Sequence, residues 1–375
     1  MSRRKNRYEN RQKKRAEKRK ALKIYDDFEN IISFKSLFRA ARKAALGVSW
    51  KASVQRYLLS ILFKISRTRK DLLKGKDIRK GFIEFDICER GKLRHIRSVH
   101  FSERVVQKSI CQNALYPMLT NGIIYHNYAS QKGKGTHFAS NKFIEYLKWF
   151  YRRHGRDGYI LLIDFKGYFE SITHEPLKEN FRKFFKDKNV VKLADDFVDA
   201  FGERGLGLGS ETSQINAIYH INKIDHYIKE KERIKCYGRY MDDSYIIHHD
   251  KKYLEDLLAR LEPLYSKYGI EINKKKTKIL SLKHGFSFLK TNFYITKTGK
   301  IIKKPRRDSI VRERRKLKRQ AKLLEQGILT LEEISKSYQS WRGSMKHRNS
   351  RRSIHKMDIL YKGLFERSTE NDKNI

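Results

Sequence analysis

Three aspartates occupy positions where carboxylates could act together. Asp164 closes an apolar run, and Asp242 and Asp243 follow each other between two short β-prone runs. If the strands that carry them are neighbours, the carboxylates converge. Oxygen ligands hold hard divalent cations, and magnesium needs only one or two carboxylates besides water and phosphates. Two such cations suit the transfer of phosphoryl or nucleotidyl groups. Taken singly, each aspartate could equally be a turn residue.

The strands that would position these aspartates can be predicted from the pattern of apolar residues. Residues 159–165 follow Gly158 as a continuous apolar run, which is typical of a buried strand. Thr173 can cap the helix that comes next. Residues 234–237 and 245–248 predict a hairpin with the carboxylates at its tip.

The neighbouring segments extend this pattern on both sides. Leucines at helical spacing between 254 and 264 predict a helix, and residues 270–279 predict a returning strand. Residues 286–298 resemble another hairpin. Residues 24–153 are mostly helical in pattern, interrupted by an extended piece at 81–88. The order predicts an α+β fold in which an antiparallel sheet is backed by helices.

Both ends of the chain are basic. Residues 2–20 hold eleven Lys or Arg and predict an extended or frayed arm that contacts nucleic acid. Near the other end, residues 309–326 predict a helix that stops at Gly327. Thr330 and Glu333 form a capping box that opens the next helix, so we expect a small helical lobe here.

Composition narrows the class of partner. The 375 residues include 86 Lys or Arg and 42 Asp or Glu, a net charge of +44, which indicates a polyanionic partner and nucleic acid first. No apolar run of about 18 residues and no signal peptide can be recognised, which argues against a membrane and predicts a cytoplasmic protein. Cys88, Cys111 and Cys236 lie far apart, which favours free thiols over a zinc site.

The motifs around the aspartates resemble those of reverse transcriptases. Residues 240–243, Tyr-Met-Asp-Asp, match the YxDD box, and residues 162–169 are similar to the first palm motif. Residues 94–107 and 128–137 resemble the finger motifs of bacterial retroelement enzymes. The resemblance implies a right-hand polymerase fold with fingers, palm and helical thumb. The implied domains are a basic arm (1–23), fingers with part of the palm (24–158), palm (159–285), primer-grip hairpin (286–302) and thumb (303–375).

The resemblance also implies roles for individual residues. It implies that Phe169 excludes the 2′-hydroxyl of ribonucleotides and that Lys276 protonates the departing pyrophosphate. The implied cofactor is a pair of Mg²⁺ ions, with Mn²⁺ as a substitute, and the implied substrates are dNTPs, a DNA primer and a template RNA. The implied metal ligands are Asp164, Asp242, Asp243 and the backbone carbonyl of Phe165; the nucleotide-binding residues are Lys132, Lys134, Phe169, Leu208, Gly209 and Gln214; and the nucleic-acid-binding residues are Tyr240, Met241, Phe288, Leu289, Lys346, His347 and Arg351.

Three positions depart from the family pattern. Gln131 stands where an arginine is usual, so either Lys132 or Lys134 would supply the positive charge near the triphosphate. Gly207 replaces a proline. Lys290 replaces the glycine that follows the primer-grip motif, which leaves the turn of that hairpin open.

The glycine-rich segment 205–214 bears most directly on the subclass. Its Gly-x-x-x-Ser-Gln ending, from Gly209 to Gln214, resembles diversity-generating retroelement enzymes. Leu208 replaces a polar glutamine, and an apolar side chain there should loosen nucleotide discrimination. This resemblance implies a dedicated structured non-coding RNA and a small basic accessory protein as partners. An antiphage-defence or other phage-borne reverse transcriptase is the alternative.

Two other classes of function stay open. A maturase or RNA chaperone would use the +44 charge without polymerising, although the three aspartates in motif order argue against it. An RNA-dependent RNA polymerase shares the palm geometry, and Phe169 argues against ribonucleotides as substrates.

Overall fold

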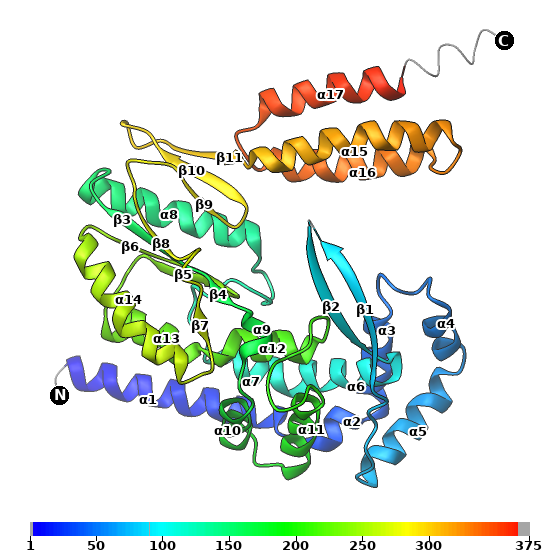
Figure 1. Ribbon diagram of the computed structural model, residues 1–375. Coiled ribbons are helices and arrows are strands. Elements are labelled where there is room, and N and C mark those ends of the chain that lie inside the picture. The colour runs from blue at the N-terminus through cyan, green and yellow to red at the C-terminus, as the bar shows by residue number, and fades with distance from the viewer. Residues whose placement is uncertain (1–2, 90, 367–375) are drawn as a thin grey trace. The chain divides into compact units, whose positions relative to one another are not determined.

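The computed structural model describes residues 3–89 and 91–366 (Figure 1). The N-terminal part of the described chain is helical. The prediction of an extended or frayed basic arm is wrong for α1 (Arg3–Leu22), which is helical. This stretch is rich in Lys, Arg and Glu and lacks Gly and Pro, a composition that favours a helix. The next elements are a 3₁₀ turn (Lys23–Tyr25), α2 (Phe28–Ile32), α3 (Phe34–Ala44), α4 (Ala52–Leu59) and α5 (Ile61–Leu73).

The chain folds into two compact units. The first comprises Met1–Ala139, Ile163–Ser244 and Glu255–Thr277, and the second comprises Ser140–Leu162, Tyr245–Leu254 and Lys278–Ile375. The domain boundaries predicted from the sequence stay predictions. Within the described ranges, every helix is too short or too polar to cross a bilayer.

A long hairpin follows the first helices. β1 (Phe82–Glu89) pairs antiparallel with β2 (Lys92–Val99). The extended piece predicted at 81–88 is therefore confirmed, whereas β2 was not foreseen. Its sequence places polar and apolar side chains on both faces, so the alternation that marks a strand is missing. The helical elements after it are α6 (Phe101–Ile110), a π-helical segment (Cys111–Leu115) and α7 (Tyr116–Asn121).

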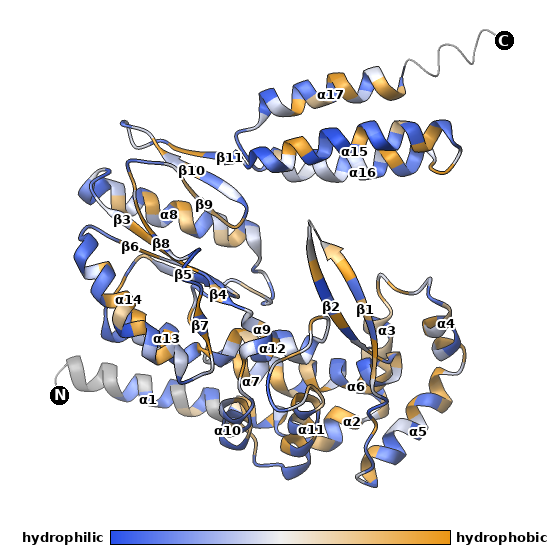
Figure 2. Ribbon diagram, in the orientation of Figure 1, coloured by the Kyte–Doolittle hydropathy of each residue, from blue (hydrophilic) through white to orange (hydrophobic). Residues whose placement is uncertain are grey.

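The predicted palm sheet is present. It has four strands in the order β5-β6-β3-β8, where β5 is Tyr237–Tyr240, β6 is Asp243–His248, β3 is Tyr159–Ile163 and β8 is Lys278–Ser281. Figure 2 shows β3 in orange, as expected for a strand of one Tyr and four Ile or Leu. Gly158 is required before it, because a Cβ there would lie 2.3 Å from the ring of Phe150. The hairpin that carries Asp242 and Asp243 is confirmed.

Two details of the palm differ from prediction. The segment 270–279 is not one strand, because a turn separates β7 (Glu271–Ile272) from β8. β7 pairs with β4 (Phe165–Lys166) instead. Thr173 caps no helix: α10 begins after His174, and the Thr173 hydroxyl donates to the carbonyl of Tyr268 at 3.3 Å.

Helices precede, separate and follow these strands along the chain. The predicted leucine-rich helix is α14 (Lys251–Ser266), and its leucines at 254, 257 and 261 are buried. The others are α8 (Thr136–His154), α9 (Tyr168–Ser171), α10 (Glu175–Phe184), α11 (Lys188–Asp199), α12 (Glu211–His220), α13 (Asn222–His226) and a π-helical segment (Tyr227–Lys231).

The second unit ends in a small sheet and three helices. The predicted hairpin forms from β9 (Phe286–Phe288) and β10 (Thr291–Ile295), and β11 (Ile301–Pro305) adds a third strand. The predicted capping box of Thr330 and Glu333 is confirmed at the start of α16. The helices are α15 (Arg307–Glu325), α16 (Leu331–Lys346) and α17 (Arg351–Phe365), and they share a core of Leu317, Ile334, Tyr338, Met357 and Phe365.

Candidate active site

Asp164 lies directly after β3 and is held by the turn between β7 and β8. Its carbonyl accepts the N–H of Asn273 at 2.8 Å, and its own N–H donates to the Thr277 hydroxyl at 3.3 Å. The carboxylate oxygen Oδ1 accepts from Asn273 Nδ2 at 3.1 Å and from Lys276 Nζ at 2.8 Å. Lys276 therefore forms a direct ion pair with Asp164, and its role in protonating the departing pyrophosphate stays a prediction.

Asp242 occupies the turn between β5 and β6, and Asp243 is the first residue of β6. Burial raises the pKa of Asp242, and the negative charge of Asp164 raises it further. The cations of Lys276 and Arg94 act in the opposite direction. The charge of Asp164 therefore makes the ionised form of Asp242 less favourable.

A buried arginine holds the turn that carries Asp242. The guanidinium of Arg239, which is inaccessible to solvent, binds both carboxylate oxygens of Asp225 at 2.6–3.1 Å. Its remaining N–H groups donate to the carbonyls of Ile218 at 2.7 Å and Met241 at 3.0 Å. Met241 has a left-handed backbone, with φ of +55°. Arg239 therefore fixes the strained residue directly before Asp242.

This arrangement meets part of what a magnesium site needs. Across the described ranges, no three His, Cys, Asp or Glu side chains gather so as to hold a metal ion. The roles of Asp164, Asp242 and Asp243 as metal ligands stay predictions. The negative charge of Asp164 acts on Asp242 and raises its pKa, and the Lys276 ammonium forms an ion pair with Asp164. A pair of hard oxygen donors with a cation already attracted to it fits Mg²⁺, which retains waters and substrate phosphates as its other ligands.

The loop 128–135, which we call the fingers loop, holds two candidate lysines, Lys132 and Lys134, and one of them is engaged in hydrogen bonds within the protein. Lys134 Nζ donates to the carbonyls of Tyr125 at 2.8 Å and Asn127 at 3.0 Å, and burial lowers its pKa. Gln131 donates to the same Asn127 carbonyl at 2.8 Å, which accounts for this departure from arginine. The Lys132 side chain is exposed. Lys132 is therefore the better candidate for an anionic ligand.

The loop 205–214 lies against α9. The N–H of Leu206 donates to the carbonyl of Phe169 at 2.7 Å, and Phe169 itself is half-buried. A Cβ at Gly207 would lie 2.1 Å from the ring of Phe201, so the aromatic ring explains this glycine.

The other predicted nucleotide-binding positions lie in the same loop and at the start of α12. Leu208 is half-buried and Gly209 has a φ of +101°. The Ser130 hydroxyl donates to Gln214 Oε1 at 3.4 Å, which connects the fingers loop to α12.

The predicted primer-grip residues divide between core and surface. The ring of Phe288 is buried and packs at 5.1 Å from Phe143 and 5.0 Å from Tyr245. Leu289 and Lys290 form the turn with φ of +46° and +59°, so the hairpin closes without the usual glycine. Two consecutive left-handed residues are typical of a type I′ turn. Of the YxDD box, Tyr240 and Met241 are both half-buried.

A basic cleft lies in the second unit. It has a volume of about 820 Å³ and includes Lys346 and Arg351, two of the predicted nucleic-acid-binding residues. His347 forms the C-cap of α16, between them in sequence. No acidic side chain lines the cleft in the part of the chain that the structure describes. Its cationic side chains are Lys304, Arg307, Lys346, Arg348, Arg351 and Arg352.

Sequence reasoning missed Asp225 and Arg239. Neither residue was assigned a role from the sequence. The signal available was weak: an arginine directly before a Tyr-Met-Asp-Asp box carries no mark of burial, and its partner is fourteen residues away in the chain.

The chain is similar to one known protein family and to several solved structures. Residues 78–293 match the family described as reverse transcriptase (RNA-dependent DNA polymerase). No curated protein matches the chain. Solved structures that match include telomerase from Candida albicans in complex with a fragment of telomeric RNA (13% identity, TM-score 0.48, covering 66% of this chain and 51% of that one). Telomerase from Candida tropicalis without its C-terminal domain also matches (14%, TM-score 0.47, covering 60% and 55%). The chain spans about half the length of these telomerases.

Proposed function

Because this chain belongs to the reverse transcriptase family, we propose that it is an RNA-directed DNA polymerase whose reaction centre is built on Asp164 and Asp242. Its α+β architecture is that of a right-hand polymerase. The observation that carries the proposal is the ion pair of Lys276 with Asp164 at 2.8 Å, at a site where the charge of Asp164 also raises the pKa of Asp242. A template RNA, a DNA primer and dNTPs are the substrates.

The residues of the chain have distinct roles in this proposal. Two bound Mg²⁺ ions, for which Mn²⁺ can substitute, would lower the pKa of the primer 3′-hydroxyl and neutralise the leaving pyrophosphate. Asp164 and Asp242 would hold them, with Asp243 and the Phe165 carbonyl as further candidate ligands. Lys276, whose Nζ lies 2.8 Å from Asp164 Oδ1, would protonate the departing pyrophosphate. Arg239 fixes the backbone before Asp242.

Substrate selection would come from the elements around the pair. Lys132 is placed to attract the triphosphate, and the ring of Phe169 on α9 would lie against the sugar. Leu208, Gly209 and Gln214 would also contact the incoming nucleotide. In the second unit, the basic cleft would follow the phosphates of the template-primer duplex, where cations supply affinity that depends on salt.

Primer extension tests the polymerase activity. On poly(rA)/oligo(dT) with Mg²⁺, we expect the wild type to extend the primer, and Asp242→Asn and Asp164→Asn to lose extension by at least about a hundredfold, since each removes a charged ligand. Asp256→Asn, an exposed aspartate of α14, is the matched control and should retain activity. Equal extension by wild type and Asp242→Asn would refute the proposal. RNA binding without extension by the wild type would favour a maturase or chaperone.

We propose further that the enzyme belongs to a diversity-generating retroelement, with an antiphage-defence or other phage-borne reverse transcriptase as the second candidate. The Gly209-to-Gln214 motif and the apolar Leu208 support the first. Leu208→Gln should then reduce misincorporation opposite template adenine, measured by sequencing the product. An unchanged error rate would show that Leu208 does not determine the fidelity of the enzyme. Two near-identical repeats differing at adenines beside the gene would support diversification, and a structured RNA in a defence island would support immunity.

A further inference from the structure

Large apolar side chains are exposed together in one segment of the first unit, residues 34–64. Leu46 and Leu59 are 77% and 87% exposed. Single exposed apolar residues are ordinary on protein surfaces, whereas a contiguous group marks an interaction site. The exposed group in this segment is Phe34, Leu46, Trp50, Leu59, Leu62 and Phe63.

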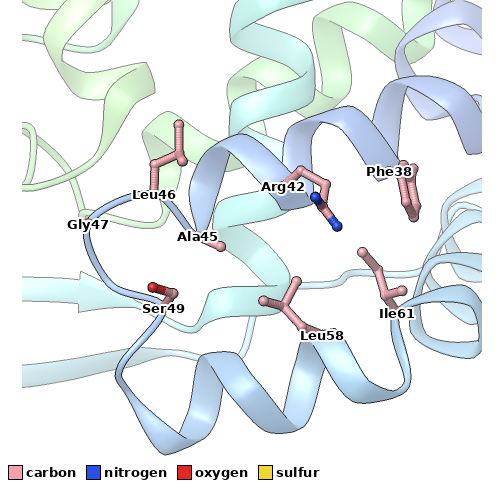
Figure 3. Close-up of a pocket in the computed structure, with 8 residues that line it drawn as sticks. All are labelled: Phe38, Arg42, Ala45, Leu46, Gly47, Ser49, Leu58 and Ile61. Carbon is pink, nitrogen blue, oxygen red and sulfur yellow. The ribbon is translucent and has the colours of Figure 1, made fainter.

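A groove runs through this segment. Figure 3 shows Phe38 and Arg42 of α3 on one side and Leu58 and Ile61, from the α4–α5 arm, on the other. The cavity between them is about 300 Å³. Phe34 and Phe38 stack with their ring centroids 6.4 Å apart, which continues the apolar face along α3. At 11 residues, α3 is about 16 Å long, the length of three helical turns.

The charge of the segment is entirely positive. Residues 34–64 include seven Lys or Arg and no Asp or Glu. Over the described ranges no ion pair is formed by these seven cations: the side chain of Lys43 donates to Gln112, and that of Lys51 lies over the ring of Trp50. Arg42 is the one charged side chain among the residues that line the groove, and the segment around it holds cations without carboxylates. Such a groove is complementary to an apolar stripe bordered by carboxylates.

We propose that this groove, between α3 and the α4–α5 arm, binds an amphipathic helix of a partner protein whose polar face is acidic. Such a helix would place apolar residues at i, i+4 and i+7 along Phe38, Leu46 and Leu58. Three other occupants fit the groove less well. A second copy of the chain would place its seven cations against the seven of the first copy, and these charges repel. A bilayer contacts convex surfaces better than a concave groove, and phosphate groups make no favourable contact with the exposed aliphatic side chains.

A designed peptide tests the proposal. The probe is a synthetic helix of about 14 residues with leucines at the i, i+4, i+7 and i+11 positions of one face and glutamates on the other. Its control is a peptide of identical composition with the leucines distributed around the helix. We expect saturable binding of the first peptide in fluorescence anisotropy, at least about tenfold tighter than the second. Hydrogen exchange should slow within residues 34–64 of the full chain.

Substitutions locate the contact. Leu46→Asp and Arg42→Glu change exposed side chains of the groove, so the fold should survive, and each should weaken binding about tenfold or more, the effect of losing one apolar or ionic anchor. Ile328→Asp, at an exposed position of the second unit, is the matched control and should bind as the wild type does.

Four outcomes would overturn the proposal. They are equal binding of the two peptides, no saturable binding of the first, exchange protection outside the segment, and Leu46→Asp leaving peptide binding unchanged. Two parallel measurements identify rival occupants. Leu46-dependent binding to phosphatidylglycerol vesicles without peptide binding would assign the face to a membrane, and Leu46-dependent dimerisation without peptide binding would assign it to a second copy. None of these measurements depends on polymerase activity. The groove proposal can therefore stand even if primer extension refutes the proposed function.

Discussion

Arg239→Lys should separate the positioning of Asp242 from the stability of the fold. The lysine keeps a positive charge near Asp225. An ammonium on a flexible stem does not reproduce the planar fork that also reaches the carbonyls of Ile218 and Met241. Without that contact, the left-handed backbone of Met241 loses its support. We therefore expect Asp242 to move from its place opposite Asp164.

The size of the effect follows from the contacts that are lost. Hydrogen bonds from a charged donor contribute about 1.5–3 kcal/mol each, so losing two carbonyl contacts should destabilise the protein by roughly 3–6 kcal/mol. Asp225→Asn breaks the buried ion pair itself, which costs about 3–5 kcal/mol as well. The two variants should therefore unfold at similar denaturant concentrations. Only Arg239→Lys releases Met241, and a displacement of about 1 Å at a reacting group can lower kcat about a hundredfold.

The assay is single-nucleotide primer extension at a temperature where both variants are folded, as judged by circular dichroism. Arg239→Lys should lose kcat about a hundredfold, and Asp225→Asn should lose several-fold less. Tyr237→Phe is a milder control, because it removes only the 2.5 Å hydrogen bond from Tyr237 to Asp225. If kcat falls in proportion to stability across all three variants, Arg239 is structural alone and the positioning argument is refuted.

Three further outcomes are expected. Phe169→Val should admit ribonucleotides, raising rNTP incorporation at least about tenfold relative to dNTPs, and unchanged selectivity would remove this ring from the gate. Arg351→Ala should lower the slope of log affinity for duplex against log salt by about 0.7–0.9, since one phosphate contact is lost; Arg182→Ala, paired on the surface with Glu175, should leave it unchanged. Burial lowers the pKa of His220 from 6.5 to about 4. The unfolded state then takes up a proton first, so the free energy of unfolding should fall by up to about 3 kcal/mol between pH 6.5 and pH 4. His220→Gln, which can still donate to the Tyr268 carbonyl, should flatten that dependence.

The sequence predicted the elements whose signals are local. The strand before Asp164 is uniformly apolar, the hairpin around Asp242 is bracketed by β-prone runs, and the capping box at Thr330 is defined by two residues three apart. Membership of the reverse transcriptase family was predicted from the same motifs and is confirmed by the match over residues 78–293. The bacterial retroelement subtype, the metal ions and the site roles stay predictions.

The features that were missed depend on distant parts of the chain. β2 has mixed polarity on both faces, and its partner β1 supplies the pairing that defines it. The segment 270–279 looks like one strand because isoleucines stand at both of its ends, yet the turn there is held by contacts with Asp164, more than a hundred residues earlier. Arg239 and Asp225 read as solvated charges until the fold buries both. In each case tertiary contacts override a local pattern.

The turn before Asp242 combines two features that oppose stability. Met241 has a left-handed backbone without being glycine, which costs about 1 kcal/mol or more, and Asp242 is a carboxylate whose charge is disfavoured by burial and by Asp164. A fully buried ion pair, Arg239 with Asp225, holds the strained residue, although apolar side chains of similar size would often be as stable. Neither strain nor repulsion improves the fold. Their presence at one turn, supported by a buried network, is what a site requires when two carboxylates must be held close until cations neutralise them.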